Sequence, residues 1–194
     1  MPTPSICVFC GAREGARMAY SAAADELGAA LAHEGWRLVY GAGDVGLMGR
    51  CARAALEAGG DLLGVIPQHL VGLEATAETG VDTRARRVVT ETMHERKKVM
   101  FMNCDAIALL PGGGGSLDEL FEVLTWRQLG LHTKPVVLID VDGYWQPLVA
   151  LLEHVVTEGF AGTDLSGGYI TVPDVPAALA TLRAALPRRQ DDAV

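Results

Sequence analysis

The sequence predicts a single-domain α/β fold: a doubly wound, Rossmann-like parallel sheet with helices on both faces. Two observations support this fold class. Short apolar runs alternate with alanine-rich amphipathic segments along the whole chain, as expected for strands that alternate with helices. The apolar runs are continuous, and this is typical of parallel strands that are buried on both faces of a sheet.

The expected strands are the apolar runs, in chain order Ile6–Phe9, Leu38–Tyr40, Leu62–Ile66, Arg87–Val89, Ala106–Leu110, Val136–Ile139 and Tyr169–Val172. The expected helices are the amphipathic segments at roughly 17–34, 46–58, 93–103, 116–129, 145–157 and 174–186. We expect the domain to cover residues 1–186 and residues 187–194 to form a polar tail. Ligands of such sheets bind at the carboxyl ends of strands, so the loops after Phe9, Tyr40 and Leu110 are the candidate binding loops.

Composition limits the classes of partner. The 194 residues include 16 basic and 24 acidic ones, for a net charge of −8, which argues against a nucleic-acid partner. No apolar run approaches the ~20 residues that span a bilayer, and the N-terminus lacks the basic start of a secretory signal. We therefore expect a cytoplasmic protein without membrane contact. Cys7 and Cys10 have C-x-x-C spacing but no further ligand pair, so we interpret them as buried thiols and expect no metal.

The segment Pro111–Glu119 reads Pro-Gly-Gly-Gly-Gly-Ser-Leu-Asp-Glu and follows an expected strand. Four glycines before a helix start indicate a backbone that closely approaches an anion. Glu119 then places a carboxylate one helical turn beyond the phosphate seat, which makes it the first candidate for chemistry. Ser116 and Glu119 also have capping-box spacing, so mutual capping is an alternative. We expect the helix start and nearby cations to keep Glu119 ionised at neutral pH.

Two further segments belong near this loop. Gly41, Gly43 and Gly46 match G-x-G-x-x-G, but no acidic residue ends the next strand, which favours a tight turn beside a nucleotide pocket over a dinucleotide site. In Thr92–Lys98, Thr92 and Glu95 have capping-box spacing. Arg96, Lys97 and Lys98 then place cations at a helix start, where a nearby anion would explain them. A solvated charged helix face is the alternative.

In these segments the chain resembles the LONELY GUY (LOG) family of cytokinin-activating phosphoribohydrolases, often mislabelled lysine decarboxylases. The pattern P-G-G-x-G-T-x-x-E is met at Pro111–Glu119, with Ser116 in place of Thr. The other matching segments are V-F-C-G at 8–11, G-L-M-G at 46–49, M-H-E-R-K at 93–97, T-W-x-Q-L-G-x-H-x-K-P at 125–135 and D-V-D-G-Y at 140–144. Ala12-Arg13 and Ala42 depart from the family pattern, which has Ser-Ser and Gly there.

The resemblance implies a homodimer that hydrolyses the N-glycosidic bond of a cytokinin riboside 5′-monophosphate or AMP, without a cofactor. It places the catalytic pair at Arg96 and Glu119. The substrate contacts that it implies are Glu74, Arg96, Lys97, Gly113, Gly114, Gly115, Ser116, Leu117, Asp118, Glu119 and Thr125, with Glu78 as a rival to Glu74. A nucleotide or phosphorylated-cofactor carrier on the same fold is the alternative function. Met93, Met100 and Met102 are expected to be exposed and are compatible with helix packing between subunits.

Overall fold

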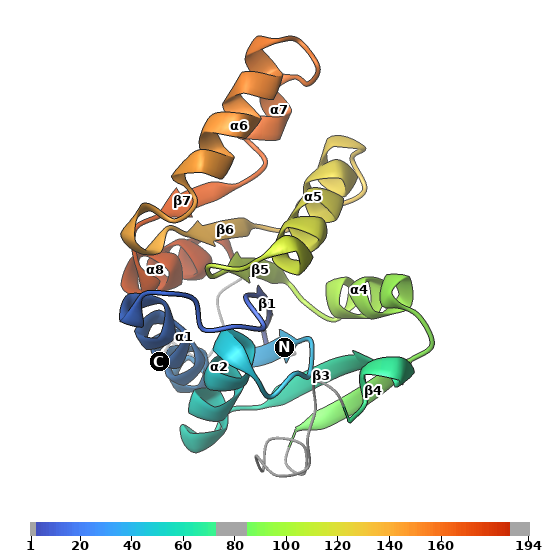
Figure 1. Ribbon diagram of the computed structural model, residues 1–194, viewed down its shortest axis with the longest axis vertical. Helices are drawn as coiled ribbons and strands as arrows, with labels where there is room; N and C mark the ends of the chain where they lie inside the picture. Colours follow the sequence, from blue (N-terminus) through green and yellow to red (C-terminus); the bar gives the residue numbers. More distant parts are fainter. Residues whose placement is uncertain (1–2, 73–84, 187–194) are drawn as a thin grey trace, which may run out of the picture.

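The computed structural model describes residues 3–72 and 85–186. It contains one seven-stranded sheet in which all strands are parallel, in the order β4-β3-β2-β1-β5-β6-β7 (Figure 1). The strands are β1 (Ser5–Phe9), β2 (Arg37–Tyr40), β3 (Leu62–Pro67), β4 (Arg86–Thr90), β5 (Ala106–Leu109), β6 (Val136–Ile139) and β7 (Ile170–Val172). The predicted fold class is confirmed, and every predicted strand is present within one residue of its expected bounds.

Helices cover both faces of the sheet (Figure 1). On one face lie α1 (Met18–His33), α2 (Gly46–Glu57) and α8 (Val175–Ala185). On the other lie α4 (Met93–Met102), α5 (Gly114–Gln128) and α6 (Gln146–Thr157). The short helices η1 (Gln68–Leu70), η3 (Val141–Gly143) and α7 (Thr163–Ser166) were not predicted, because one turn is too short to show a helical period.

The alternation of side chains along β1 divides the core into two layers. Ile6 and Val8 belong to the buried cluster under α1, α2 and α8, while Cys7 and Phe9 belong to the cluster under α4, α5 and α6. Within the first layer, α1 and α2 pack very closely, since a Cβ on Gly28 would lie 2.1 Å from Cys51 O. The start of α2 lies beside the end of β1, where Met48 N donates to Gly11 O at 3.3 Å.

The chain runs outward from β1 to β4 and then returns to place β5 on the other side of β1. The carboxyl ends of β1 and β5 therefore form the topological switch point, where sheets of this class bind ligands. Among the described residues, no helix is both long enough and apolar enough to cross a membrane.

Candidate active site

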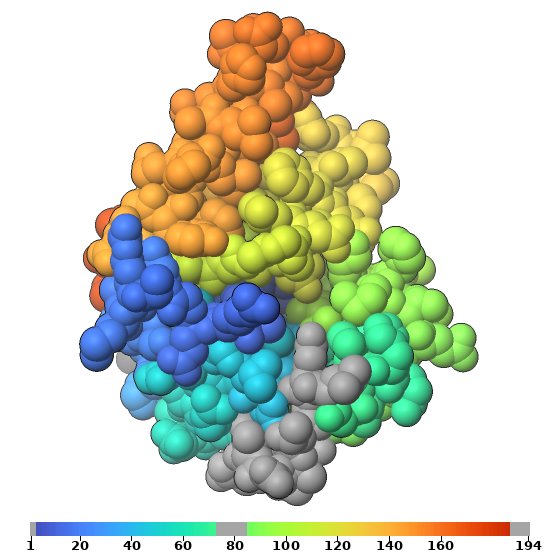
Figure 2. All heavy atoms as spheres, viewed as in Figure 1, coloured from blue at the N-terminus to red at the C-terminus, as the bar shows by residue number. Residues whose placement is uncertain are grey.

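A cavity of about 460 Å³ opens at the switch point, within the range of roughly 300–1,000 Å³ that is usual for small-molecule sites. It is lined by the loop after β1, by Gly41 after β2 and by Pro111–Gly115 after β5. Figure 2 shows the dark blue loop after β1 between the cyan start of α2 and the yellow-green start of α5. The three loops that were predicted from the sequence to bind a ligand therefore all line this cavity.

The glycine-rich loop leaves open space at the start of α5. The helix begins at Gly114, with Gly113 as its N-cap residue. A Cβ added to Gly113, Gly114 or Gly115 would meet no atom within 4 Å, and none of the three has a positive φ. Neither packing nor backbone conformation requires glycine here, although glycine in a helix is less stable than alanine. Close approach of a ligand to the backbone N–H groups explains these residues better.

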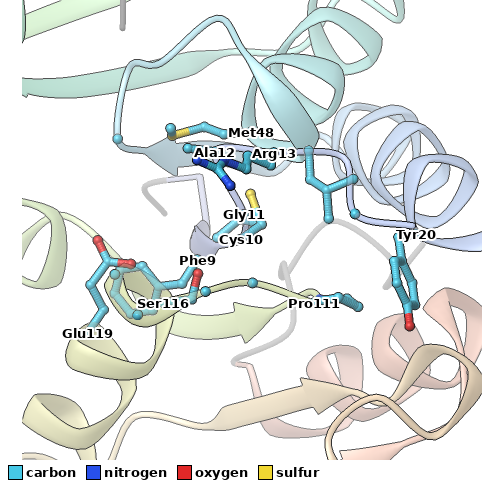
Figure 3. A pocket seen from close by; sticks show the side chains of 18 of the residues that line it. Phe9, Cys10, Gly11, Ala12, Arg13, Tyr20, Met48, Pro111, Ser116 and Glu119 are labelled. Carbon is cyan, nitrogen blue, oxygen red and sulfur yellow. The ribbon is translucent and has the colours of Figure 1, made fainter. Parts of the chain in front are cut away.

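Ser116 and Glu119 both line this cavity (Figure 3). Ser116 is only 3% exposed and is the third residue of α5, whose N-cap makes no side-chain hydrogen bond. The alternative that Ser116 and Glu119 form a capping box is therefore wrong. Glu119 is half-buried one turn further along the helix, and its side chain lies on the same side of the cavity as that of Ser116 (Figure 3).

The surroundings of Glu119 change its protonation. Removal from water raises its pKa to about 7, while Arg96 and Lys97 act to lower the pKa and Asp118 and Glu122 act to raise it. We expected Glu119 to stay ionised at neutral pH, but a group with this pKa is only partly ionised there, because the loss of hydration outweighs the stabilisation by the two nearby cations. A carboxyl group with a pKa near neutrality can both accept and donate a proton under ordinary conditions.

Arg96 reaches the cavity from α4. Its guanidinium is buried and donates from Nε to Val65 O at 3.1 Å and from Nη2 to Gly41 O at 2.7 Å. The start of α4 is fixed by the predicted capping box, in which Glu95 N donates to Thr92 Oγ1 at 3.2 Å. Burial of Arg96 argues against the alternative of a solvated charged face at this residue.

Lys97 is also buried, but it does not line the cavity. Its Nζ lies 2.9 Å from Asp118 Oδ2 and 3.1 Å from Glu122 Oε2, so it joins α4 to α5. Neither of the other lysines, Lys98 and Lys134, lines the cavity. Lys134 Nζ donates to the carbonyl oxygens of Phe101 and Cys104.

The structure brings about half of the predicted site residues together at the cavity: Arg96, Gly113, Gly114, Gly115, Ser116 and Glu119. Four further predicted residues do not line the cavity: Lys97, Leu117, Asp118 and Thr125. Thr125 Oγ1 instead donates to Phe121 O at 2.7 Å. Glu74 and Glu78 lie outside the described residues, so both assignments stay predictions. Sequence reasoning did not name Tyr20 and Tyr144 as site residues, although both line the cavity, Tyr20 from α1 and Tyr144 from the turn after η3. Tyr144 ends the D-V-D-G-Y segment, which was the signal that could have identified it.

The unusual alanine in the second loop has a structural cost. Ala42 has φ 55°, in the left-handed region that favours glycine, and its Cβ would lie 2.8 Å from a Cβ placed on Gly64. The lack of a side chain at Gly64 therefore leaves room for the methyl group of Ala42. Cys10 also lines the cavity, with the pKa of its thiol raised well above its ordinary value by burial, so it forms a neutral wall.

Within the described ranges, no group of three or more His, Cys, Asp or Glu side chains is arranged to hold a metal ion. The fold and the cavity define a Rossmann-like protein with a glycine-rich helix start that lines a cavity at the switch point of its sheet. The comparisons with known proteins narrow this class.

A family model described as "Possible lysine decarboxylase" matches residues 48–182. The chain is 43% identical over 182 residues to "Probable cytokinin riboside 5′-monophosphate phosphoribohydrolase LOGL9" of Oryza sativa subsp. japonica, covering 94% of this chain and 78% of the relative. It is 42% identical over 184 residues to "Cytokinin riboside 5′-monophosphate phosphoribohydrolase" of Rhodococcoides fascians, covering 94% and 91%. The chain belongs to this LOG family, as the sequence motifs predicted.

Among solved structures, the molybdenum cofactor carrier protein of Chlamydomonas reinhardtii superposes with a TM-score of 0.72 at 24% identity, covering 96% of this chain and 100% of that one. A molybdenum cofactor binding protein of Rippkaea orientalis gives a TM-score of 0.68 at 23% identity, covering 95% and 98%. At this level of identity the likeness concerns the fold alone.

Proposed function

We propose that this protein hydrolyses the N-glycosidic bond of a cytokinin riboside 5′-monophosphate or AMP, releasing the free base and ribose 5-phosphate. One observation carries the proposal: a single cavity holds both an unobstructed glycine-rich helix start and a carboxyl group of pKa about 7 one turn beyond it. The helix start suits a phosphate. A site that only held phosphate has no need of Glu119.

The chemistry follows from the position of Glu119. When the bond between C1′ and the base nitrogen breaks, its electron pair leaves with the base, and positive charge develops on the ribose as in glycoside hydrolysis. An ionised Glu119 beside the ring stabilises that charge and takes a proton from the water that adds to C1′. The departing base then takes up the proton that Glu119 removed from the water, which restores the carboxylate. Ribose 5-phosphate and the free base result.

Arg96 and the phosphate seat align the substrate in this scheme. Because two donors of Arg96 are already engaged by Val65 and Gly41 carbonyls, the guanidinium is held rigidly at the cavity wall. Its positive charge favours the ionised form of Glu119 and attracts the anionic nucleotide. Binding of the 5′-phosphate at the helix start then converts binding energy into orientation of the ribose over Glu119.

The description of the family as a lysine decarboxylase does not suit this cavity. A pyridoxal enzyme needs a lysine at the reacting carbon to form a Schiff base. All three lysines of the chain lie outside the lining of the cavity. The carrier alternative shares the phosphate seat but leaves Glu119 without a role, so hydrolysis is the better supported function.

We also propose that the protein is a homodimer that pairs through α4 and α5. These helices and the turn after α5 expose five apolar side chains: Met93, Met102, Phe121, Leu129 and Leu131. Met100 is buried and lines the cavity. The expectation that Met100 is exposed is therefore wrong. Light scattering at micromolar concentration tests the proposal: Phe121→Asp should turn a dimer into a monomer, and a monomeric unmodified protein contradicts it.

The activity is tested by incubating the protein with AMP, N6-isopentenyl-AMP and adenosine and measuring the released base by chromatography. We expect base release from one or both nucleotides and far slower release from adenosine, because the phosphate provides alignment as well as binding. Tight nucleotide binding without base release favours a carrier. Equal kcat/KM for AMP and adenosine argues against the phosphate seat.

A further inference from the structure

The cavity contains a second arginine, Arg13, on the loop after β1. In Figure 3 it lies across the cavity from Pro111 and Ser116. Arg13 belongs to the exposed part of the cavity wall. It plays no part in the scheme above.

Arg13 differs from the other arginines that the structure describes. Each of them has at least one hydrogen bond or ion pair with a protein group, whereas Arg13 has none among the described residues. Its neighbours in the loop are engaged: Glu14 accepts a hydrogen bond from Ser21 Oγ at 3.1 Å and lies 3.7 Å from Arg50 Nη1. Arg17 Nη1 donates to Asp142 O at 3.1 Å.

The backbone that carries Arg13 is fixed beside the glycine-rich loop. Gly11 N donates to Pro111 O at 3.0 Å, and Met48 N donates to Gly11 O at 3.3 Å. A Cβ on Gly11 would lie 2.9 Å from Arg13 O and 3.5 Å from Gly112 Cα, so the two loops flank the same point. A Cβ on Gly46 would lie 2.4 Å from Arg13 N, which shows how tightly the loop packs against α2. Arg13 therefore has an anchored backbone and an uncommitted guanidinium.

The other cations near the phosphate seat are already committed. Lys97 is held by two carboxylates and lies outside the cavity lining, and Arg96 uses two of its donors on backbone carbonyls. A phosphate at the start of α5 would be met by backbone N–H groups and the Ser116 hydroxyl. These groups leave its outward-facing oxygens without a cationic partner. A guanidinium is well suited to that role, because its planar fork binds two phosphate oxygens at once.

We propose that Arg13 is a specificity-determining residue that closes over the 5′-phosphate of the bound nucleotide from the loop after β1. The inference rests on the proposed function only in taking the ligand to be a 5′-phosphorylated riboside. It predicts selection for the phosphorylated form of the ligand, with little contribution to binding of the base.

The test separates phosphate recognition from catalysis by measuring equilibrium binding of the product ribose 5-phosphate, and of adenosine, by calorimetry. Arg13→Gln should weaken ribose 5-phosphate binding about tenfold, as expected for loss of one charged hydrogen-bonding partner, and leave adenosine binding unchanged. Arg13→Lys should recover part of the loss. Arg17→Gln removes the same charge four residues further along and is the matched control, expected to bind like the unmodified protein.

Hydrolysis of AMP is measured separately on the same proteins. Unchanged ribose 5-phosphate binding in Arg13→Gln overturns the inference, and so does an equal loss for adenosine or for Arg17→Gln. If the unmodified protein binds ribose 5-phosphate in an Arg13-dependent manner but releases no base from any nucleotide, the inference stands and the proposed hydrolysis fails. If it binds neither ribose 5-phosphate nor AMP, both are overturned.

Discussion

Arg96 Nη2 lies 2.7 Å from Gly41 O, and a Cβ on Gly41 would lie 1.9 Å from that same nitrogen. The lack of a side chain at Gly41 is therefore what lets Arg96 reach the carboxyl end of β2 and stay at the cavity wall. The first glycine of the G-x-G-x-x-G match thus makes room for a protein side chain. This relation explains the first glycine of the motif without a dinucleotide.

Gly41→Ala should consequently act on activity through Arg96. We expect kcat to fall by roughly 10², similar to the loss of one fixed electrostatic group, since the guanidinium must move away from the cavity. Steady-state kinetics of Gly41→Ala, Arg96→Ala and the double variant provide the check. If both changes act through one group, their effects are not additive, and full additivity would contradict the relation.

Glu119→Gln should lower kcat by roughly 10²–10³, because it keeps the shape of the side chain but removes the charge that opposes the developing cation. Binding of AMP should change far less, and it should tighten if the carboxylate repels the phosphate. A melting curve confirms that the variant is folded. Near-normal turnover in a folded Glu119→Gln protein would remove Glu119 from the mechanism.

The pattern of apolar runs predicted the fold well because the inner strands β1, β2, β3, β5 and β6 are buried along nearly their whole length. Ile6 and Cys7 illustrate this, since they point into different layers of the core. The same regularity located the binding loops, since parallel strands end at one edge. The sequence did not predict properties that depend on which side chains lie around a residue in the folded protein. The pKa of Glu119 depends on the groups around it. The burial of Met100 depends on how closely α4 packs against the sheet. Ser116 lies inside the helix because α5 begins two residues earlier than expected.

The pH dependence of hydrolysis should report the raised pKa of Glu119. Because the ionised form is the active one, kcat/KM should fall as the pH drops below about 7. Asp118 raises the pKa of Glu119, so Asp118→Asn should lower that pKa and shift the acid limb of the profile to lower pH. The second ionisation of the substrate phosphate, at about pH 6, is common to both proteins and cancels in the comparison. An unshifted limb would contradict the assignment.

Gly115→Ala should separate stability from binding. The added Cβ meets no protein atom, and alanine in the first turn of a helix is favoured over glycine by roughly 0.5–1 kcal/mol. The midpoint of thermal unfolding should therefore stay the same or rise slightly. Affinity for AMP should nevertheless fall at least severalfold, because the methyl group occupies space that the phosphate needs. A variant that is more stable and binds AMP normally would place the phosphate elsewhere.

Tyr144 should act as a positioning residue for the glycine-rich loop. Its hydroxyl donates to Gly112 O at 2.5 Å, and because that peptide bond is trans, the N–H of Gly113 points in the opposite direction. Tyr144 thereby holds the first backbone donor of the phosphate seat in place. Tyr144→Phe keeps the ring and its edge contact with Tyr20, whose centroid lies 5.5 Å away. The Tyr144→Phe change should raise KM for AMP severalfold and lower the free energy of unfolding by about 1 kcal/mol.

Tyr20→Phe is the control, since no hydrogen bond of its hydroxyl is found among the described residues, and it should behave like the unmodified protein. If Tyr144→Phe changed kcat/KM for AMP and for adenosine by the same factor, the hydroxyl would have no specific role in orienting the phosphate-binding loop.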